Sequence, residues 1–227
     1  MPRNKWGSDQ PDISIHVEKA AGEFSLYLDG FRAASVVGED MLGLNLIRTV
    51  DEALISRITT FRVVHAGAVT WRGRALLLPG KTHSGKSSLV IELLRQGASY
   101  LSDEYALIDS DGLVYAYPRP LLVRTGYAQQ TPVLPETYGR IAASGPLPVA
   151  WVVALQYSSN ADWKLTALAQ SEGLMMLLQN TPHVLADMPE ITDIFGHAVA
   201  GARCYAGYRN HAPAAAREIL RFIDRMN

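Results

Sequence analysis

The sequence predicts an α/β fold, and three neighbouring features support this prediction. Residues 80–87 read Gly-Lys-Thr-His-Ser-Gly-Lys-Ser, which matches the pattern G-x-x-x-x-G-K-[ST]. The apolar run 75–78 before it suits a buried strand, and residues 88–96 after it have the apolar spacing of a helix. A glycine-rich turn between a strand and a helix exposes consecutive backbone N–H groups and points a helix N-terminus at an anion. The segment is therefore expected to hold the phosphates of a nucleotide.

Individual residues of this loop have separate expected roles. The two glycines let the backbone curl closely round phosphates, Lys86 reaches the β- and γ-phosphates, and Ser87 offers its hydroxyl to Mg²⁺. The expected ligands are ATP and Mg²⁺, although no short motif chooses between ATP and GTP. The residues expected to contact the nucleotide are Gly80, Lys81, Thr82, His83, Ser84, Gly85, Lys86, Ser87 and Ser88.

The composition indicates which partners and which compartment to expect. The 227 residues are 48% hydrophobic and 19% charged, with a net charge of −1, so neither nucleic acid nor an anionic membrane is an expected partner. A single cysteine, Cys204, cannot form an internal disulfide, which favours a reducing cytoplasm. The N-terminus lacks the apolar segment of a signal peptide, and apolar stretches such as 149–155 are too short to span a membrane.

The chain is expected to divide into three parts. Residues 1–11 read as a disordered tail, 12–59 as a small N-terminal β/α region, and 60–227 as the domain that contains the loop. Alternating or continuous apolar patterns predict strands at 13–17, 24–28, 31–37, 61–65, 66–71, 74–78, 100–101, 106–108, 113–117, 121–124, 149–155 and 202–208. Helical spacing predicts helices at 39–58, 88–96, 171–179 and 213–226.

One long segment carries no predicted strand or helix. Residues 125–148 are rich in Gly, Pro, Gln and Thr. Such a segment is typical of a mobile substrate loop or lid, and equally of a passive surface connection. The sequence does not decide between these two interpretations.

Two adjacent carboxylates, Asp103 and Glu104, follow the short strand at 100–101. Adjacent carboxylates repel each other and are seldom placed near a core without a cation. We therefore expect this pair to act in catalysis or in holding a metal ion. Asp109 also follows an apolar run, but the Ser-Asp-Gly after it favours a turn. His65 ends an apolar run, and its local pattern alone favours a structural role.

These segments together resemble a known family. The order of His65-Ala66, strand, loop, helix and Asp103-Glu104 is that of the catalytic domain of HPr kinase/phosphorylase, over about residues 60–124. The HPr-kinase-related group is the most similar, and its characteristic segments appear here as 77–80 (Leu-Leu-Pro-Gly), 84–87 (Ser-Gly-Lys-Ser), 102–106 (Ser-Asp-Glu-Tyr-Ala) and 117–120 (Tyr-Pro-Arg-Pro). The resemblance implies a P-loop kinase fold related to that of ATP-dependent phosphoenolpyruvate carboxykinase, with a small N-terminal β-rich region.

The resemblance also implies roles for individual residues. Asp103 maps to the general base that acts on a serine hydroxyl, and His65 to a histidine close to that base. Glu104 maps to the carboxylate that holds Mg²⁺ with Ser87. Arg124 occupies a position where related proteins carry a basic residue and is expected to clamp the transferring phosphoryl oxygens. Arg119 is a weaker candidate for the same task.

Three departures from the family limit what is implied. Glu104 and His83 stand where HPr kinases typically have Asp and Gly. The long N-terminal regulatory domain and the Gly/Arg-rich segment that meets HPr are not found. HPr itself is therefore not implied as the substrate, and phosphorylase activity is not implied either.

The sequence thus predicts an ATP-dependent serine kinase that acts on a protein or peptide, for example a ribosomal peptide precursor. Two alternatives stay open: a kinase for a small molecule such as an amino acid or a sugar, and a nucleotide-binding regulatory module without catalysis. The sequence does not name the acceptor. The oligomeric state is also open, and the resemblance implies a homo-oligomer.

Overall fold

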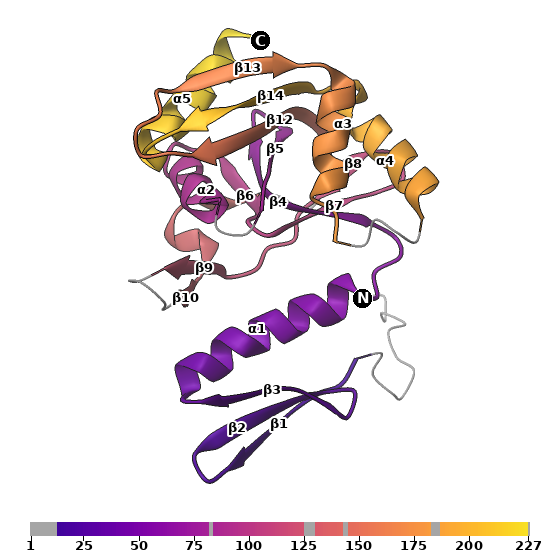
Figure 1. Cartoon of the computed structure of the whole chain (residues 1–227), viewed down its shortest axis with the longest axis vertical. Helices are drawn as coiled ribbons and strands as arrows, with labels where there is room; N and C mark the ends of the chain where they lie inside the picture. Colours follow the sequence, from indigo (N-terminus) through magenta and orange to yellow (C-terminus); the bar gives the residue numbers. More distant parts are fainter. Residues whose placement is uncertain (1–12, 82–83, 125–129, 143–144, 183–186, 227) are drawn as a thin grey trace, which may run out of the picture. The chain divides into compact units, whose positions relative to one another are not determined.

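The computed structural model describes residues 13–81, 84–124, 130–142, 145–182 and 187–226. The chain divides into two compact units (Figure 1). One comprises residues 1–58 with 124–132, and the other 59–123 with 133–227. The predicted tail at 1–11 lies outside the described residues. No helix in the described ranges is long and apolar enough to cross a membrane.

The N-terminal unit is a three-stranded antiparallel sheet followed by a helix. Strands β1 (Ile15–Ala20), β2 (Glu23–Leu28) and β3 (Phe31–Val37) pair in chain order, and α1 (Glu39–Ile55) packs against β2 and β3. The predicted turn at Asp29-Gly30 joins β2 to β3, and both residues have positive φ. The strands predicted at 24–28 and 31–37 and the helix predicted from residue 39 are confirmed, although the helix ends three residues earlier than expected.

The larger unit is built on a mixed sheet, in which nine strands are described. They are β4 (Arg62–Trp71), β5 (Arg74–Pro79), β6 (Ser99–Ser102), β7 (Tyr105–Ile108), β8 (Leu113–Tyr115), β11 (Arg140–Ile141), β12 (Leu147–Tyr157), β13 (Lys164–Leu168) and β14 (Arg203–Arg209). Their order is β11-β6-β4-β7-β8-β12-β14-β13, and β5 lies between β4 and β12. The long strands β4 and β12 each pair with several shorter ones, which joins the parts of the sheet.

Helices cover both faces of this sheet. On one face, α2 (Lys86–Arg95) and α5 (Ala212–Arg225) pack on each other and on a core that contains Leu76, Trp151 and Tyr205. On the other, α3 (Gln170–Gln179) and α4 (Met188–Ala200) cover a second core. Residues of β5 alternate between the two cores, as successive residues of a strand covered on both faces must. The chain is therefore a mixed α/β protein with a central mixed sheet.

Some strands and helices were missed or predicted with the wrong bounds. The sequence did not predict β13 or α4, and the strands expected at 61–65 and 66–71 are the single strand β4. The segment 125–148 is not one irregular loop, because it contains β10 (Gln130–Val133), a 3-10 turn (Pro135–Thr137), β11 and the start of β12. Strands β9 (Leu121–Arg124) and β10 lie where the chain passes from the larger unit into the smaller one and back. Short strands in a Pro- and Thr-rich segment have no clear period, so tertiary pairing decides them.

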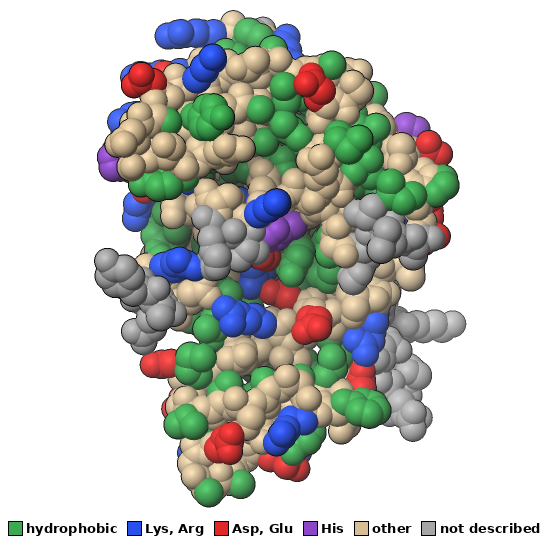
Figure 2. Space-filling model, in the orientation of Figure 1, with side chains coloured by type: hydrophobic (Ala, Val, Ile, Leu, Met, Phe, Trp, Pro, Cys, Tyr) green, Lys and Arg blue, Asp and Glu red, His purple; other side chains and the backbone are tan. Residues whose placement is uncertain are grey.

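Charged side chains of both signs are interspersed over the face of the molecule drawn in Figure 2. This distribution agrees with the net charge of −1.

Candidate active site

Three neighbouring strands bring the candidate residues together. β5 leads into the loop that begins at Gly80, β4 beside it carries His65, and β6 on the far side of β4 leads into Asp103 and Glu104. Backbone hydrogen bonds join these segments. The N–H of Gly80 donates to the carbonyl of His65 (3.4 Å), and the N–H of Ala66 donates to the carbonyl of Glu104 (3.1 Å). The residues that the sequence singled out are thus neighbours in space.

The loop opens toward the first turn of α2. Gly85 precedes the helix with φ of 82°, a left-handed conformation that glycine adopts without a steric penalty. Among the described residues no side chain caps this helix, so its first N–H groups are left for another acceptor. Thr82 and His83, which were also expected to contact the nucleotide, lie outside the described residues.

Lys86 is buried inside the loop. Its Nζ donates to the carbonyls of Gly80 (2.8 Å) and Lys81 (3.0 Å). Burial lowers the pKa of Lys86, and the charges of Glu104 and Asp103 act in the opposite direction. An ammonium group has three N–H donors, so one donor remains for a phosphate oxygen. The lysine therefore closes the loop and presents a positive charge inside it.

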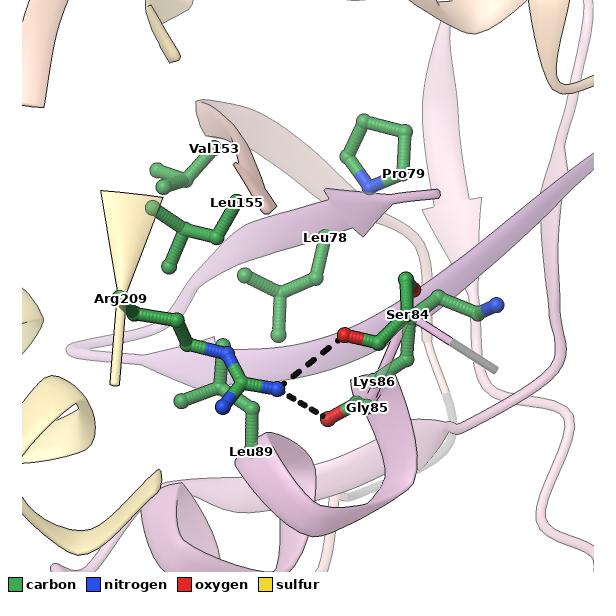
Figure 3. Close-up of a pocket in the computed structure, with 9 residues that line it drawn as sticks. All are labelled: Leu78, Pro79, Ser84, Gly85, Lys86, Leu89, Val153, Leu155 and Arg209. Carbon is green, nitrogen blue, oxygen red and sulfur yellow. Dashed lines mark hydrogen bonds between the residues drawn. The ribbon is translucent and has the colours of Figure 1, made fainter. Parts of the chain in front are cut away.

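Arg209, at the end of β14, supports the loop from behind (Figure 3). Its Nη2 donates to the carbonyls of Ser84 (3.2 Å) and Gly85 (3.0 Å), and its Nη1 to the carbonyl of Asn210 (3.0 Å). In a planar trans peptide the C=O and N–H groups point in opposite directions. Because the two carbonyls face Arg209, the N–H groups of Gly85 and Lys86 face away from it, toward the inside of the loop. Burial lowers the pKa of Arg209.

Asp103 is 1% exposed and surrounded by donors. Its Oδ2 accepts a hydrogen bond from Ser87 Oγ (3.0 Å), and its Oδ1 lies 3.1 Å from the hydroxyl of Tyr100 and 3.5 Å from Arg119 Nη1. Burial raises the pKa of Asp103, while Arg119 and Ser87 reduce that shift. Burial and the charge of Asp103 raise the pKa of Tyr100. In P-loop NTPases a Ser or Thr of the loop and an Asp outside it together hold Mg²⁺.

Glu104 has a different environment from its neighbour. Its Oε1 lies 2.6 Å from His65 Nε2, and the side chains of His65 and Glu104 are 18% and 30% exposed. Burial alone would raise the pKa of Glu104, but the hydrogen bond and charge of His65 and the charge of Lys86 lower it overall. Both side chains border an open cavity of about 520 Å³, which Lys81 and the end of α3 also line. A ligand in this cavity can reach Glu104, whereas Asp103 is covered.

The observed contacts pair these residues differently from the arrangement that the resemblance implied. The resemblance implied that His65 lies beside Asp103 and that Ser87 works with Glu104. In the structure His65 pairs with Glu104, and Ser87 pairs with Asp103. Asp103 and Glu104 form the bend between β6 and β7, where one carboxylate contacts Ser87 of α2 and the other contacts His65 of β4.

The remaining candidates are Arg119, Asp109, Arg124 and Ser88. Arg119 is buried and pairs with Asp103, so it stabilises the carboxylate instead of facing a ligand. Asp109 accepts backbone hydrogen bonds from Asp111 and Leu113, which confirms its role in a turn. Arg124 belongs to the segment that groups with the smaller unit, and its phosphoryl-clamping role stays a prediction. Ser88 lies in the first turn of α2, with its side chain exposed.

Sequence reasoning missed two residues of this site, Tyr100 and Arg209. Tyr100 was assigned only to a strand. The signal for Arg209 was an arginine at the end of a mostly apolar strand, where a surface role is the simpler interpretation.

The donor set fits Mg²⁺. Within the described residues no group of three or more His, Cys, Asp or Glu side chains is placed to hold a metal ion. Mg²⁺ does not need one, because it commonly binds one or two carboxylates together with substrate phosphates and water. Ser87 and the neighbouring carboxylates supply the oxygen ligands expected of the protein.

Comparisons with known proteins add a likeness in fold. No family model matches the chain, and no curated protein matches it. Among solved structures, the chain is similar to the HPr(Ser) kinase/phosphatase from Coxiella burnetii, with 12% sequence identity and a TM-score of 0.44. The match covers 73% of this chain and 97% of that one. A likeness of this size leaves the function to be inferred from the site itself.

Proposed function

We propose that the protein transfers the γ-phosphoryl group of Mg-ATP to a hydroxyl group, with a serine of a protein or peptide as the acceptor. The observation that carries this proposal is the position of Glu104 and His65. They border an open cavity that also reaches the phosphate-binding loop at Lys81. A proton acceptor, a binding loop and room for a second substrate are the three parts that phosphoryl transfer to a hydroxyl requires.

Binding of the phosphates rests on the loop and on α2. The N–H groups of residues 85–87 at the N-terminus of α2 attract an anion, and Lys86 adds a full positive charge. Arg209 keeps the N–H groups of Gly85 and Lys86 turned inward. These groups are arranged before the ligand arrives, so they neutralise the charge of the transferred group without reorganising.

Ser87 and Asp103 are the residues that would hold Mg²⁺. The ion, when bound, would neutralise phosphate charge and orient the phosphate chain. Asp103 keeps Ser87 oriented through the 3.0 Å hydrogen bond, and Arg119 and Tyr100 keep Asp103 in place. The buried carboxylate balances positive charge at the floor of the site.

Glu104 is the proposed acceptor of the hydroxyl proton. Burial raises the pKa of Asp103, which would strengthen Asp103 as a base, but the acceptor hydroxyl must reach the base. Asp103 is enclosed and its oxygens already accept hydrogen bonds, whereas Glu104 borders the cavity. The lowered pKa of Glu104 keeps it ionised and able to accept a proton at neutral pH. His65 holds its carboxylate in one orientation.

Several kinds of acceptor suit the cavity at Glu104. Its open form and polar lining suit a serine on an extended peptide, and they also suit a free amino acid or a sugar. The presence of Lys86 together with both carboxylates favours a catalytic protein over a nucleotide-binding module without catalysis.

The test is a transfer assay with labelled γ-phosphate. Wild type, Glu104→Gln and Asp103→Asn are incubated with Mg-ATP and an extract of the source organism, and with a pool of small metabolites in a parallel arm. Calorimetry measures nucleotide binding. We expect Glu104→Gln to bind Mg-ATP as wild type does and to lose transfer by about 10²- to 10⁴-fold. We expect Asp103→Asn to lose the Mg²⁺ dependence of binding.

Other outcomes reassign the roles. If Asp103→Asn binds Mg-ATP normally but transfers nothing, and Glu104→Gln has lost Mg²⁺, then Asp103 is the base and Glu104 the metal ligand. Label found only in the metabolite arm identifies a small-molecule kinase. ATP binding without transfer in either arm supports the regulatory module.

A further inference from the structure

A large cavity lies beside the phosphate-binding loop and shares Lys81 with the cavity at Glu104 and His65. Its volume is about 750 Å³, and its border includes Gly80, Lys81 and Ser84 of the loop. Neither His65 nor Glu104 lines it. Pockets of about 300–1,000 Å³ are the usual size for a small-molecule ligand, so this cavity is large enough for a nucleoside.

Strand pairing builds the floor of this cavity from two rows of side chains. One row is Gln156, Tyr208 and Lys164, which lie opposite one another on β12, β14 and β13. The next row on the same face is Ala154, Ala206 and Thr166. Directly opposite residues of neighbouring strands share a face of the sheet. The floor is therefore a patch of small side chains, bounded on one side by an aromatic ring and two polar groups.

The wall of the cavity comes from α3 through Met176, Gln179 and Asn180. Two of these also meet the cavity at Glu104, so the two spaces adjoin at the end of α3. A flat ring that enters over the two alanines would lie between the sheet and α3.

Tyr208 and Tyr157 are exposed aromatic residues at the ends of strands that are otherwise mostly buried. They are 49% and 56% exposed, and both line the cavity. The guanidinium of Arg209 lies 5.4 Å from the ring centre of Tyr157. Within the described residues Tyr208 has no aromatic or hydrogen-bonding partner, so its ring is available to a ligand. Aromatic side chains beside a cavity are the usual partners of a nucleobase.

Two other cavities that the described residues form at the loop are less suited to this task. The cavity between Arg209 and Leu78 has a volume of only about 10 Å³, which is the room of a single water molecule (Figure 3). The cavity at Glu104 must receive the acceptor hydroxyl, because the proton acceptor lies there. A nucleotide whose terminal phosphate points to Glu104 must extend its nucleoside away from that side.

We propose that the large cavity, called here the nucleoside cleft, binds the base and ribose of the nucleoside triphosphate. The base lies over Ala154 and Ala206 against the ring of Tyr208, and Gln156 and Lys164 hydrogen-bond its edge. This inference rests on the proposed function, since it takes the loop as the triphosphate site.

The test separates the nucleoside from the phosphates. Calorimetry measures the affinity of ATP and of inorganic tripolyphosphate for wild type, Tyr208→Ala and Tyr208→Phe, all with Mg²⁺. Base–aromatic stacking predicts that Tyr208→Ala weakens ATP binding by about 5- to 150-fold. Tripolyphosphate affinity is expected to stay unchanged, since the loop is intact. Tyr208→Phe keeps the ring and is expected to bind ATP as wild type does.

A second variant tests the floor. Ala206→Leu places a larger side chain where the base is expected, and should weaken ATP binding but not tripolyphosphate binding. Circular dichroism melting curves check that each variant is folded.

Other results would overturn the inference. If Tyr208→Ala and Ala206→Leu bind ATP as wild type does, the nucleoside lies elsewhere, and a raised KM for the acceptor in those variants would assign the cleft to the acceptor. If wild type binds neither ATP nor tripolyphosphate, the proposed function itself fails and the inference with it.

Discussion

The hydroxyl of Ser87 donates a hydrogen bond to Oδ2 of Asp103 over 3.0 Å. This contact links the first turn of α2 to the end of β6, two segments that meet only because β4 lies between β5 and β6. It leaves Glu104, the next residue, to pair with His65 on the cavity side. Asp103 is therefore the buried carboxylate, whereas Glu104 is the carboxylate that borders the cavity.

Replacing Ser87 by Ala is expected to weaken Mg²⁺-dependent ATP binding by about tenfold or more and to lower the free energy of unfolding. A buried carboxylate oxygen that loses its donor costs about 1–3 kcal/mol. Calorimetry with and without Mg²⁺, together with urea unfolding, measures both effects. Ser88→Ala is the matched control, because the exposed Ser88 side chain lies one residue further along α2. Equal effects of the two variants would argue against a specific role for the Ser87–Asp103 bond.

His65→Asn is expected to reduce phosphoryl transfer by about 10- to 100-fold, by analogy with the loss of a residue that orients a catalytic group. His65 acts through Glu104, so ATP affinity should not change. Steady-state rates and calorimetry on the same preparation separate the two quantities. A parallel fall in ATP affinity would instead indicate that the side chain of His65 also supports nucleotide binding.

The sequence predicted which residues belong to the site better than it predicted which of them contact one another. The loop motif and the Asp103-Glu104 pair were recognised from local patterns, and His65 was recognised only through the family resemblance. The pairing of His65 with Glu104 was not, since the direction of adjacent side chains depends on how β4, β5 and β6 align. Such alignment is a tertiary property that no local period records.

Arg209 illustrates a second limit. It contacts the carbonyl of Ser84, 125 residues earlier in the chain, through backbone atoms that carry no sequence signal. The helix α4 was missed although the sequence carried a local signal for it. Its buried positions, Ile191, Ile194, Phe195, Ala198 and Val199, have the spacing of one helix face, and Pro189 suits a first turn. These residues pack into the second core.

Gly85→Ala is expected to destabilise the protein by about 1–3 kcal/mol and to weaken ATP binding strongly. Gly85 has φ of 82°, which is strained for alanine, and an added Cβ would collide with Nη2 of Arg209. Thermal unfolding and calorimetry test the two effects. Gly196→Ala in α4 is the control, because nothing lies within 4 Å of an added Cβ there. It should stabilise the helix by about 0.5–1 kcal/mol. Normal ATP binding by Gly85→Ala would show that Arg209 does not set the loop conformation.

Stability should depend on pH in opposite ways for the two carboxylates. The folded pKa of Asp103 is raised above its ordinary value of 3.8, so its contribution to stability is full below that value and is lost as the pH rises through the folded pKa. Asp103→Asn is therefore expected to gain stability relative to wild type as the pH rises, provided that the amide keeps the hydrogen bonds of Tyr100 and Ser87.

The pKa of Glu104 is lowered from its ordinary value of 4.5, so the stability it contributes is present above that value and is lost as the pH falls through the folded pKa. Glu104→Gln is expected to be less stable than wild type at neutral pH, with the difference shrinking as the solution is acidified. Urea unfolding of wild type and both variants at several pH values between about 3 and 7, without Mg²⁺, measures the two slopes. Because the same fold and the same neighbours are present in all three proteins, opposite slopes would tie the buried carboxylate to Asp103 and the histidine-paired one to Glu104. Equal slopes would mean that the two side chains share one environment, and the separate roles proposed for them would then have no basis.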